Sequence, residues 1–466
     1  MERKGIRRLA LLKKLAGTSW GADSKILTRV YTGAVRPAME YASTSWSTAA
    51  KTNISRLDKV QNMGLRLILG AMKTTPVKDM EKTADIEPLE RRRDLKILFQ
   101  GEKMKRLPTH QLHSRLEQPT KNRLKRTSLN HKYKGLSTEH KEVLQTGEET
   151  PNPLPLPEWR PDDEADITIS LTVPGITSKD QAETALKNLT LAMIDDSYPA
   201  GTWTHVYTDG SAEKATHNGG SGVHIQYTDV DNSNFAVPGG QLCSNYRAEV
   251  LAITTAANFL TSSEKPLGKV SIFTDSMSTL QALDSSDPNP LIRTLKDSLS
   301  SLSKIVPITL QWIPAHVGIP GNEQADKLAK EGSQLPQQPV PSTYEEAKTI
   351  IRAKFNKDWA TENNGYQARR DPIRFLERQH QTSIYRLRTG HCCLRSHLHR
   401  IGVKQSPLCE CGVNQTPYHI LQDCPLLQAE RLRVWPVATD VETKLQGTVD
   451  DLNRTVQFLT STELKF

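Results

Sequence analysis

The strongest constraint on the fold is a change of pattern near Thr202, where helical periodicity gives way to short strands that alternate with helices. Runs rich in β-branched and aromatic residues, such as 205–208 and 269–274, predict strands, and the longer segment 244–260 predicts a helix. The predicted order over 202–334 is three strands, helix, strand, two helices, strand, helix. This order indicates a mixed five-stranded α/β sheet flanked by helices, in which an antiparallel meander leads into parallel β-α-β units.

The flanking segments have different compositions. Residues 1–107 repeat Leu, Ile and Val at helical spacing and are predicted to be helical. Residues 108–165 are rich in Lys, Arg, Gln and Thr and end in closely spaced prolines and acids, and residues 108–201 are predicted to form a largely disordered linker. Prolines between 336 and 341 indicate a second linker. Residues 342–466 are predicted to form a helical, basic tail that contains a Cys/His cluster.

Two details of local structure follow from glycine. Gly70 stands at the end of a helical pattern and is predicted to stop that helix. The sequence Asn218-Gly219-Gly220 lies between two predicted strands and is typical of a tight turn. We therefore expect the first two strands of the sheet to meet at this turn.

Composition excludes some classes of protein and favours a polyanionic partner. Apolar stretches fall well short of the ~18 residues of a membrane span, and the first residues lack the apolar core of a secretory signal. We therefore expect an intracellular protein, in the nucleus or the cytoplasm. The net charge is +9, and residues 1–150 hold 31 Lys and Arg against 16 Asp and Glu. This basic block either binds nucleic acid or forms solvated helix faces.

Acidic residues stand at the ends of the predicted elements of the α/β segment. They are joined by one histidine in the loop before the last helix, and the set is Asp209, Glu249, Asp275, Asp326 and His316. Carboxylates at the same ends of parallel strands point into one crevice. Gathering them in apolar surroundings is costly unless cations neutralise them. Two Mg²⁺ ions would do so and would form a clamp for phosphodiester cleavage. Singly, each residue has an ordinary structural interpretation, but the joint pattern favours catalysis.

The predicted domain at 202–334 resembles the RNase H domain of non-LTR (LINE-type) retrotransposon reverse transcriptase polyproteins. The matching motifs are Tyr-Thr-Asp-Gly-Ser at 207–211, Asn-Tyr-Arg-Ala-Glu at 245–249, Phe-Thr-Asp-Ser at 273–276, Trp-Ile-Pro-Ala-His-Val-Gly at 312–318 and Gly-Asn-Glu-Gln-Ala-Asp at 321–326. The resemblance implies an endonuclease that hydrolyses the RNA strand of an RNA/DNA hybrid by a two-metal mechanism and leaves 3′-hydroxyl and 5′-phosphate ends.

The resemblance also implies a role for each acid. Asp209 would bridge both Mg²⁺ ions, for which Mn²⁺ could substitute. Glu249 and Asp275 would complete the ligands of the ion on the nucleophile side, and Asp326 those of the other ion. His316 would assist proton transfer or product release.

Three further residues are implied to contact the nucleic acid: Gly210, Asn245 and Ser276. Asn245 resembles the residue that lies near a 2′-hydroxyl, the group by which RNA is told from DNA. Met277 departs from the family, because many relatives carry Gln after Asp-Ser. A hydrogen bond to the substrate could therefore be missing here.

The flanks also resemble parts of LINE elements. Residues 8–46 resemble the region after the palm of their reverse transcriptases, but no Tyr/Phe-x-Asp-Asp motif precedes them. We therefore expect no DNA synthesis by this chain alone. The predicted function is thus a retrotransposon-derived ribonuclease H. The alternative is a nucleic-acid-binding relic that does not cleave, and the four filled acidic positions favour the enzyme. The sequence leaves the oligomeric state open.

Near the C-terminus, four soft or borderline ligands lie within 16 residues: Cys409, Cys411, His419 and Cys424. Such a set could close a tetrahedral Zn²⁺ site, or the residues could be reduced and partly buried without a metal. The pattern resembles the zinc-knuckle-like tail of LINE elements, although their tails usually open with Cys-x-x-Cys. Its implied role is to grip nucleic acid.

Overall fold

A computed structural model of the chain describes residues 1–117, 127–140, 167–178, 181–214, 216–228, 230–285, 289–462 and 464. Its contacts divide the chain into two compact units. Unit 1 comprises residues 1–100, 119–136 and 354–466, and unit 2 comprises residues 101–118 and 137–353. The predicted proline-rich part of the first linker, at 151–157, lies outside the described residues.

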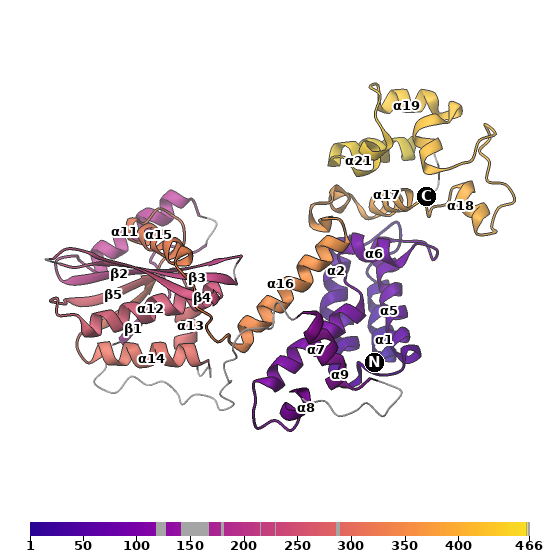
Figure 1. The fold of residues 1–466 in the computed structure, drawn as a ribbon. Coiled ribbons are helices and arrows are strands. Elements are labelled where there is room, and N and C mark those ends of the chain that lie inside the picture. The colour runs from indigo at the N-terminus through magenta and orange to yellow at the C-terminus, as the bar shows by residue number, and fades with distance from the viewer. Residues whose placement is uncertain are drawn as a thin grey trace. The chain divides into compact units, whose positions relative to one another are not determined.

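A six-stranded mixed sheet forms the centre of unit 2 (Figure 1), in the order β1-β6-β5-β2-β3-β4. The first four strands of this order are parallel, and β3 and β4 are added antiparallel to β2. The strands are β1 (Ile167–Ser170), β2 (Trp203–Glu213), β3 (His217–Gln226), β4 (Ser233–Leu242), β5 (Lys269–Thr274) and β6 (Ile308–Trp312).

The mixed sheet flanked by helices is confirmed, and the order of elements within 202–334 is as predicted. The sheet has one strand more than predicted, because β1 comes from the segment expected to be a linker and pairs with β6. The same segment contains the helix α11 (Glu183–Ser197), whose Met193 and Ile194 join the core of unit 2. The part of the predicted linker next to the sheet is therefore folded.

Helices cover both faces of the sheet. Figure 1 shows α12 and α14 on one face and α15 with α11 on the other. The helices that follow α11 in unit 2 are α12 (Asn245–Ser262), α13 (Met277–Leu283), α14 (Pro290–Ser303) and α15 (Pro320–Gln334). Between them and the sheet lies one apolar core, with Val206, Ile272 and Leu310 fully buried. Burial of such side chains is the main driving force for this layered arrangement.

The sequence Asn218-Gly219-Gly220 does not form the predicted turn. It lies inside β3, which begins at His217, four residues after β2 ends at Glu213. The glycines are needed for packing instead. A Cβ atom on Gly220 would lie 2.1 Å from the backbone of α15 at Ala329, and one on Gly222 would lie 1.9 Å from the carbonyl oxygen of Ala325. Glycine here lets a helix approach the strand backbone directly.

The segment after α15, predicted as a second linker, packs along the edge strand β4. The backbone N–H of Gln241 donates to the carbonyl oxygen of Gln338 (3.0 Å), and the N–H of Gly240 donates to Oε1 of Gln337 (2.8 Å). This segment leads into α16 (Tyr344–Glu362), of which residues up to 353 belong to unit 2. The contacts of unit 2 therefore extend beyond residue 334.

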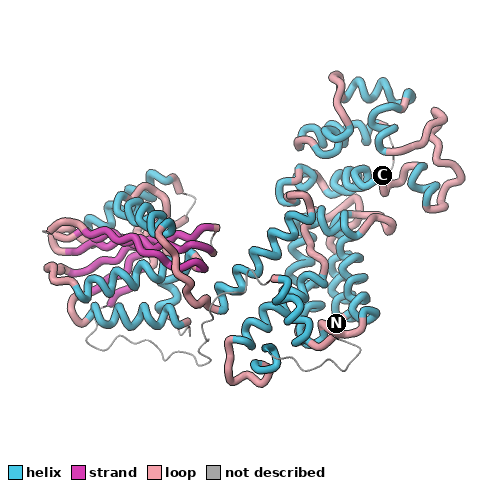
Figure 2. The backbone as a smooth tube through the Cα atoms, viewed as in Figure 1, coloured by secondary structure: helices cyan, strands magenta, loops and turns pink. Residues whose placement is uncertain are grey.

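Unit 1 is helical, and all strands of the described residues lie between 167 and 312 (Figure 2). The helices before the sheet are α1 (Glu2–Lys13), α2 (Ser24–Val30), a π-helical turn (Tyr31–Val35), α3 (Arg36–Glu40), α4 (Ser43–Trp46), α5 (Lys51–Leu69), α6 (Val77–Ala84), α7 (Leu89–Lys105), α8 (His113–Glu117) and α9 (Leu129–Glu139). Gly70 ends α5 with a left-handed backbone (φ 64°), as predicted. Helices α7, α9 and α16 contain residues of both units, and α8 belongs to unit 2.

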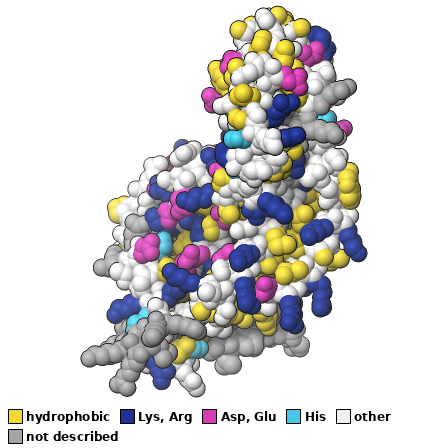
Figure 3. All heavy atoms as spheres, turned by 90° about the vertical axis from the view of Figure 1, so that its right-hand side faces the viewer, with side chains coloured by type: hydrophobic (Ala, Val, Ile, Leu, Met, Phe, Trp, Pro, Cys, Tyr) yellow, Lys and Arg dark blue, Asp and Glu magenta, His cyan; other side chains and the backbone are white. Residues whose placement is uncertain are grey.

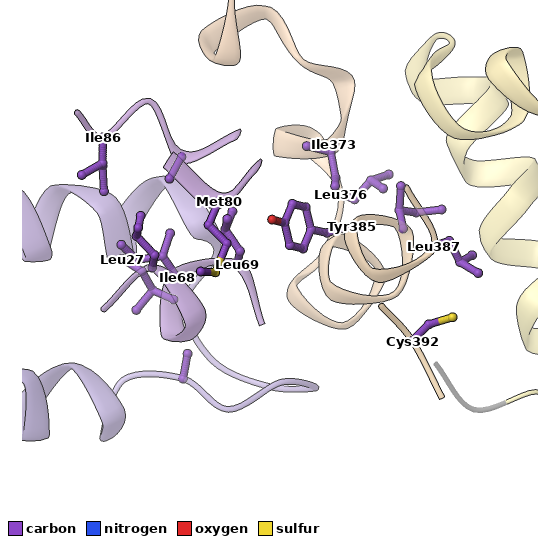
Figure 4. Close-up of a cluster of buried hydrophobic side chains, with 14 of the residues drawn as sticks. Leu27, Ile68, Leu69, Met80, Ile86, Ile373, Leu376, Tyr385, Leu387 and Cys392 are labelled. Atoms are coloured by element: carbon purple, nitrogen blue, oxygen red, sulfur yellow. The ribbon is translucent and has the colours of Figure 1, made fainter. Parts of the chain in front are cut away.

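The C-terminal part of unit 1 packs on its N-terminal helices. Short helical turns lie at Ala368–Arg370, Pro372–Phe375, His419–Asp423 and Pro425–Leu427, and the longer helices are α17 (Arg378–Thr389), α18 (Arg395–Arg400), α19 (Gln428–Val434), α20 (Val441–Gln446) and α21 (Val449–Ser461). Figure 4 shows Tyr385 of α17 facing Met80 and Leu69 in the shared core. No helix in the described part of the chain has the length and apolar character needed to cross a membrane.

Candidate active site

Two of the predicted acids lie where two neighbouring parallel strands stop pairing with each other. Thr208 of β2 pairs with Thr274 of β5, so Asp209 and Asp275 are the next residues on the two strands. The sequence predicts that Asp209 ends its strand. Instead, β2 continues to Glu213, because β3 pairs with this extension and places Gly222 opposite Asp209. Asp209 still lies where the parallel pairing ends, which is the usual place for a site in such a sheet.

Glu249 approaches from the first turns of α12. A Cβ atom on Gly210 would lie 2.3 Å from the backbone nitrogen of Glu249, so the strand and the start of the helix are in direct backbone contact. The hydroxyl group of Ser276 donates a hydrogen bond to the Glu249 carboxylate. β2 and α12 are thus in contact beside Asp209 and Glu249, which brings these two acids together.

Asp326 comes from α15, on the face of the sheet where Gly222 permits close packing. Its side chain is 15% exposed, and Lys330, one turn later, donates to its carboxylate. Asp326 is near enough to Asp209 and to Asp275 for its negative charge to raise the pKa of both. The structure therefore brings all four predicted acids to one end of the sheet.

The acids have raised pKa values. Burial, followed by the charge of Asp275, raises the pKa of Asp209 to about 8, although the backbone N–H of Gly210 donates to its Oδ1 at 2.6 Å. Burial and Asp275 also raise the pKa of Glu249 to about 7. Each negative charge disfavours the next one, so a set of carboxylates like this needs positive charge to ionise together. The donor atoms are all oxygens, which suits hard divalent cations.

The pKa of Asp275 is affected by two groups that act against the burial of its carboxyl group. Burial raises its pKa, while the charge of His316 and a hydrogen bond from Asn322 oppose this rise. His316 is exposed in the loop between β6 and α15 and has a left-handed backbone (φ 53°). Glu323 steadies this loop by accepting a hydrogen bond from the N–H of Gly318 (3.3 Å).

Asn322 is a site residue that the sequence did not single out. It is 2% exposed, and its Oδ1 has no hydrogen-bond partner in the described structure. The signal that could have identified it is its spacing, because Asn322 lies four residues before Asp326 and thus on the same face of α15.

The three residues predicted to contact nucleic acid lie around the same end of the sheet. Asn245 is the exposed first residue of α12, and Gly210 is partly buried against that helix. Ser276 is only 4% exposed, and its hydroxyl group is engaged with Glu249 and caps α13 by accepting from the N–H of Thr279 (3.4 Å). Contact with nucleic acid stays a prediction for all three.

The Cys/His cluster forms a second site, within unit 1. The ligand atoms of Cys409, Cys411, His419 and Cys424 all lie within 4.8 Å of one another, so the group could hold a metal ion. The sulfur atoms of Cys409 and Cys424 are 3.8 Å apart, and Nε2 of His419 is 3.1 Å from the sulfur of Cys411. A tight turn, in which the N–H of Cys409 donates to the carbonyl oxygen of Val413, positions the first two cysteines.

Comparisons with known proteins match the segment that contains the four acids. A sequence model of the family described as RNase H matches residues 202–334. The ribonuclease H of Stutzerimonas stutzeri (strain A1501) is 32% identical over an alignment of 152 residues, and the match covers 30% of this chain and 97% of that protein. The ribonuclease H of Rhizobium meliloti (strain 1021) is 29% identical over 28% of this chain and 88% of that protein. The crystal structure of RNase H1 from the halophilic archaeon Halobacterium salinarum NRC-1 matches with a TM-score of 0.24 and 19% identity, over 28% of this chain and 96% of that one.

Proposed function

The chain belongs to the RNase H family, and on this premise we propose that unit 2 hydrolyses the RNA strand of RNA/DNA hybrids in a reaction that depends on Mg²⁺. The observation that carries the proposal is the convergence of Asp209, Glu249, Asp275 and Asp326 at the end of the parallel strands. These are the acids expected from the motifs within the matched segment. The matched relatives are themselves named ribonuclease H.

The acids would hold two Mg²⁺ ions. The raised pKa values of Asp209 and Glu249 support this assignment, because bound cations would favour the ionised carboxylates that repel one another without them. When bound, such ions activate the attacking water and stabilise the leaving oxygen of a phosphodiester. The fold positions the four ligands: two acids are placed by β2 and β5, one by α12 and one by α15.

Residues around the acids would handle the proton and the substrate. His316 is exposed and close enough to Asp275 to affect its pKa, and histidine exchanges a proton readily near neutral pH. Asn245 is exposed at the start of α12, where an amide can donate to a 2′-hydroxyl group. We therefore assign proton transfer or product release to His316 and recognition of the RNA strand to Asn245.

Basic side chains support nucleic acid as the partner. Figure 3 shows Lys and Arg side chains spread over one face of the molecule. In α1, the exposed basic residues are Arg3, Lys4, Arg7 and Arg8, and Lys13 and Lys14 follow at its end. Contacts of such residues with phosphates release counterions, so binding through them would weaken as the salt concentration rises.

We also propose that the Cys/His cluster binds Zn²⁺ and that the chain derives from a LINE-type retrotransposon. Tetrahedral coordination with Zn–S distances of ~2.3 Å places two sulfurs ~3.8 Å apart, and Cys409 and Cys424 have this separation. The origin is supported by the motifs of the RNase H domain, by residues 8–46 and by the position of the cluster after the nuclease domain.

Cleavage of a labelled RNA/DNA hybrid tests the nuclease function. Asp209→Asn keeps the size of the side chain but removes its charge, so we expect the rate in Mg²⁺ to fall by at least about a thousandfold. Asp297→Asn is the matched control, because Asp297 is exposed on α14. We expect it to cleave like the wild type. A folded wild-type chain that binds the hybrid without cutting it would contradict the proposal and support the non-cleaving alternative.

A further inference from the structure

Glu346 lies in the first turn of α16, twelve residues beyond the segment matched by the family, and is 4% exposed. Its Oε2 accepts hydrogen bonds from the backbone N–H of Thr343 (2.9 Å) and from Nη1 of Arg247 (3.0 Å). The hydroxyl oxygen of Thr343 accepts in return from the N–H of Glu346 (3.1 Å). This reciprocal pair is a capping box, which fixes the start of α16.

The other oxygen of the same carboxylate fixes the start of α12. Oε1 of Glu346 accepts from both the backbone N–H and the hydroxyl group of Ser244, each at 3.2 Å. Ser244 is the N-cap residue of α12, and its Oγ accepts from the N–H of Arg247 (3.1 Å). One buried carboxylate therefore holds the first turns of two helices.

The first turn of α12 also has a rigid contact with the sheet. Gly210 of β2 touches the backbone of residues 248 and 249, and the hydroxyl group of Ser221 donates to the carbonyl oxygen of Ala248 (2.7 Å). Asn245 lies between this contact and the one made by Glu346, and Glu249 is itself part of the contact with the sheet. A shift at either end would move Glu249 relative to Asp209.

The charges at this junction balance each other. Arg247 is 7% exposed, and its Nη1 also donates to the carbonyl oxygen of Pro341 (2.9 Å). A buried guanidinium is stable here because the Glu346 carboxylate lies beside it. Without that carboxylate, Arg247 would keep a buried charge, and the turn that carries it would rearrange towards solvent.

We propose that Glu346 is a positioning residue for the active site, which sets the first turn of α12 and thereby the place of Glu249 and Asn245. The catalytic unit of this chain accordingly reaches past residue 334 into α16. The proposal rests on the proposed nuclease function for its kinetic consequence, but the effect on the helix turn can be measured without it.

Three full-length variants test the role of Glu346. Glu346→Gln removes the charge, and Glu346→Asp keeps the charge but shortens the side chain by one methylene group. Glu345→Gln is the matched control, because Glu345 is the preceding residue, is 70% exposed and forms a surface ion pair with Lys348. Because a displacement of about 1 Å in an active site can cost about a hundredfold in rate, we expect kcat to fall at least about tenfold in both Glu346 variants. KM for the hybrid should also rise, because Asn245 moves with the same turn, and the Mg²⁺ concentration for half-maximal rate should rise several-fold.

Amide hydrogen exchange of peptides that cover 244–250 gives a readout that does not depend on catalysis. Exchange should be faster in both Glu346 variants than in Glu345→Gln, while exchange in β5 stays as in the wild type. If Glu346→Asp is folded and has wild-type exchange, kcat and Mg²⁺ dependence, the proposal is wrong. If the wild type does not cleave but the exchange differences are found, the nuclease function fails while the structural role of Glu346 stands.

Discussion

Asp209 and Glu81 are both buried carboxyl groups, and their surroundings separate two causes of a raised pKa. Around Asp209, burial acts together with three other acids. Glu81 of α6, which is 8% exposed, has its pKa raised to about 7 mainly by burial, with a smaller effect of Asp58. A single buried acid of this kind is a cost to folding, whereas a group of buried acids indicates a site for cations.

The pH dependence of stability should reveal Glu81. Its folded pKa of about 7 lies above the ordinary 4.5, so its contribution to stability is complete below about pH 4.5 and is lost as the pH rises through 7. Glu81→Gln should therefore stabilise unit 1 at pH 8, on the order of 1–3 kcal/mol, and make little difference at pH 4. Denaturant unfolding at the two pH values measures this.

The control for Glu81 is Glu90→Gln, because Glu90 is exposed on α7. It should leave the stability unchanged at both pH values. A loss of stability in Glu81→Gln at pH 8 would mean that the ionised carboxylate is favoured in the folded protein, contrary to the effect of its burial.

Sequence motifs identify the residues of the acidic site better than they identify the residues that support it. Asp209, Glu249, Asp275 and Asp326 each lie in a short motif, so one local pattern was enough to name them. Glu346 contacts Ser244, which lies 102 positions away in the sequence. No local sequence pattern predicts a contact between residues so far apart. Asn322 could be named from its spacing to Asp326, but its hydrogen bond to Asp275 joins residues that are distant in the sequence.

At the level of elements, the contact between α15 and β3 decides where Asp326 lies. Gly222→Ala would place a methyl group 1.9 Å from the carbonyl oxygen of Ala325, so the helix must move away from the sheet. We expect a loss of about 1–3 kcal/mol in stability from this overpacking, together with a loss of cleavage as Asp326 moves. Thermal unfolding and the hybrid assay measure the two effects.

Gly201→Ala is the control for that substitution, because nothing lies within 4 Å of a Cβ atom at Gly201. It should keep both stability and activity close to the wild type. Wild-type activity in Gly222→Ala would show that the position of α15 is not as critical for the site as its backbone contact with β3 suggests.

Periodicity predicted most elements, and its failures have physical causes. Helices of unit 1 and the strands of 202–334 bury a regular face, which leaves a clear pattern in the sequence. The strand β1 has only four residues, and its partner Ile308 is 141 positions from Ile167, so neither length nor local context reveals it. The glycines of β3 predict a turn instead of a strand because glycine serves both turns and close packing.

At the scale of the whole chain, the two sites belong to different units and should respond to different metals. A chelator selective for zinc over magnesium should remove about one zinc per chain and lower the unfolding temperature of unit 1, because structural zinc contributes directly to folding. Cleavage by unit 2 should persist. Metal analysis, thermal unfolding and the hybrid assay of the treated protein measure these outcomes.

Two cysteine variants serve as a matched pair for the zinc experiment. Cys411→Ser removes one of the four grouped ligands and should lower the zinc content well below one per chain, whereas Cys393→Ser lies outside the group and should retain it. Equal zinc content in the two variants would show that these four residues are not the ligands.

The edge strand β1 has a practical consequence for anyone who trims the chain to residues 202–334. In the folded protein, the outer edge of β6 is occupied by Ile167–Ser170. In a fragment that begins at Thr202, β6 would become an edge strand with unpaired backbone N–H and C=O groups. Such an edge can pair with strands of other molecules. Self-association of that fragment would then reflect a missing four-residue neighbour rather than a natural oligomer.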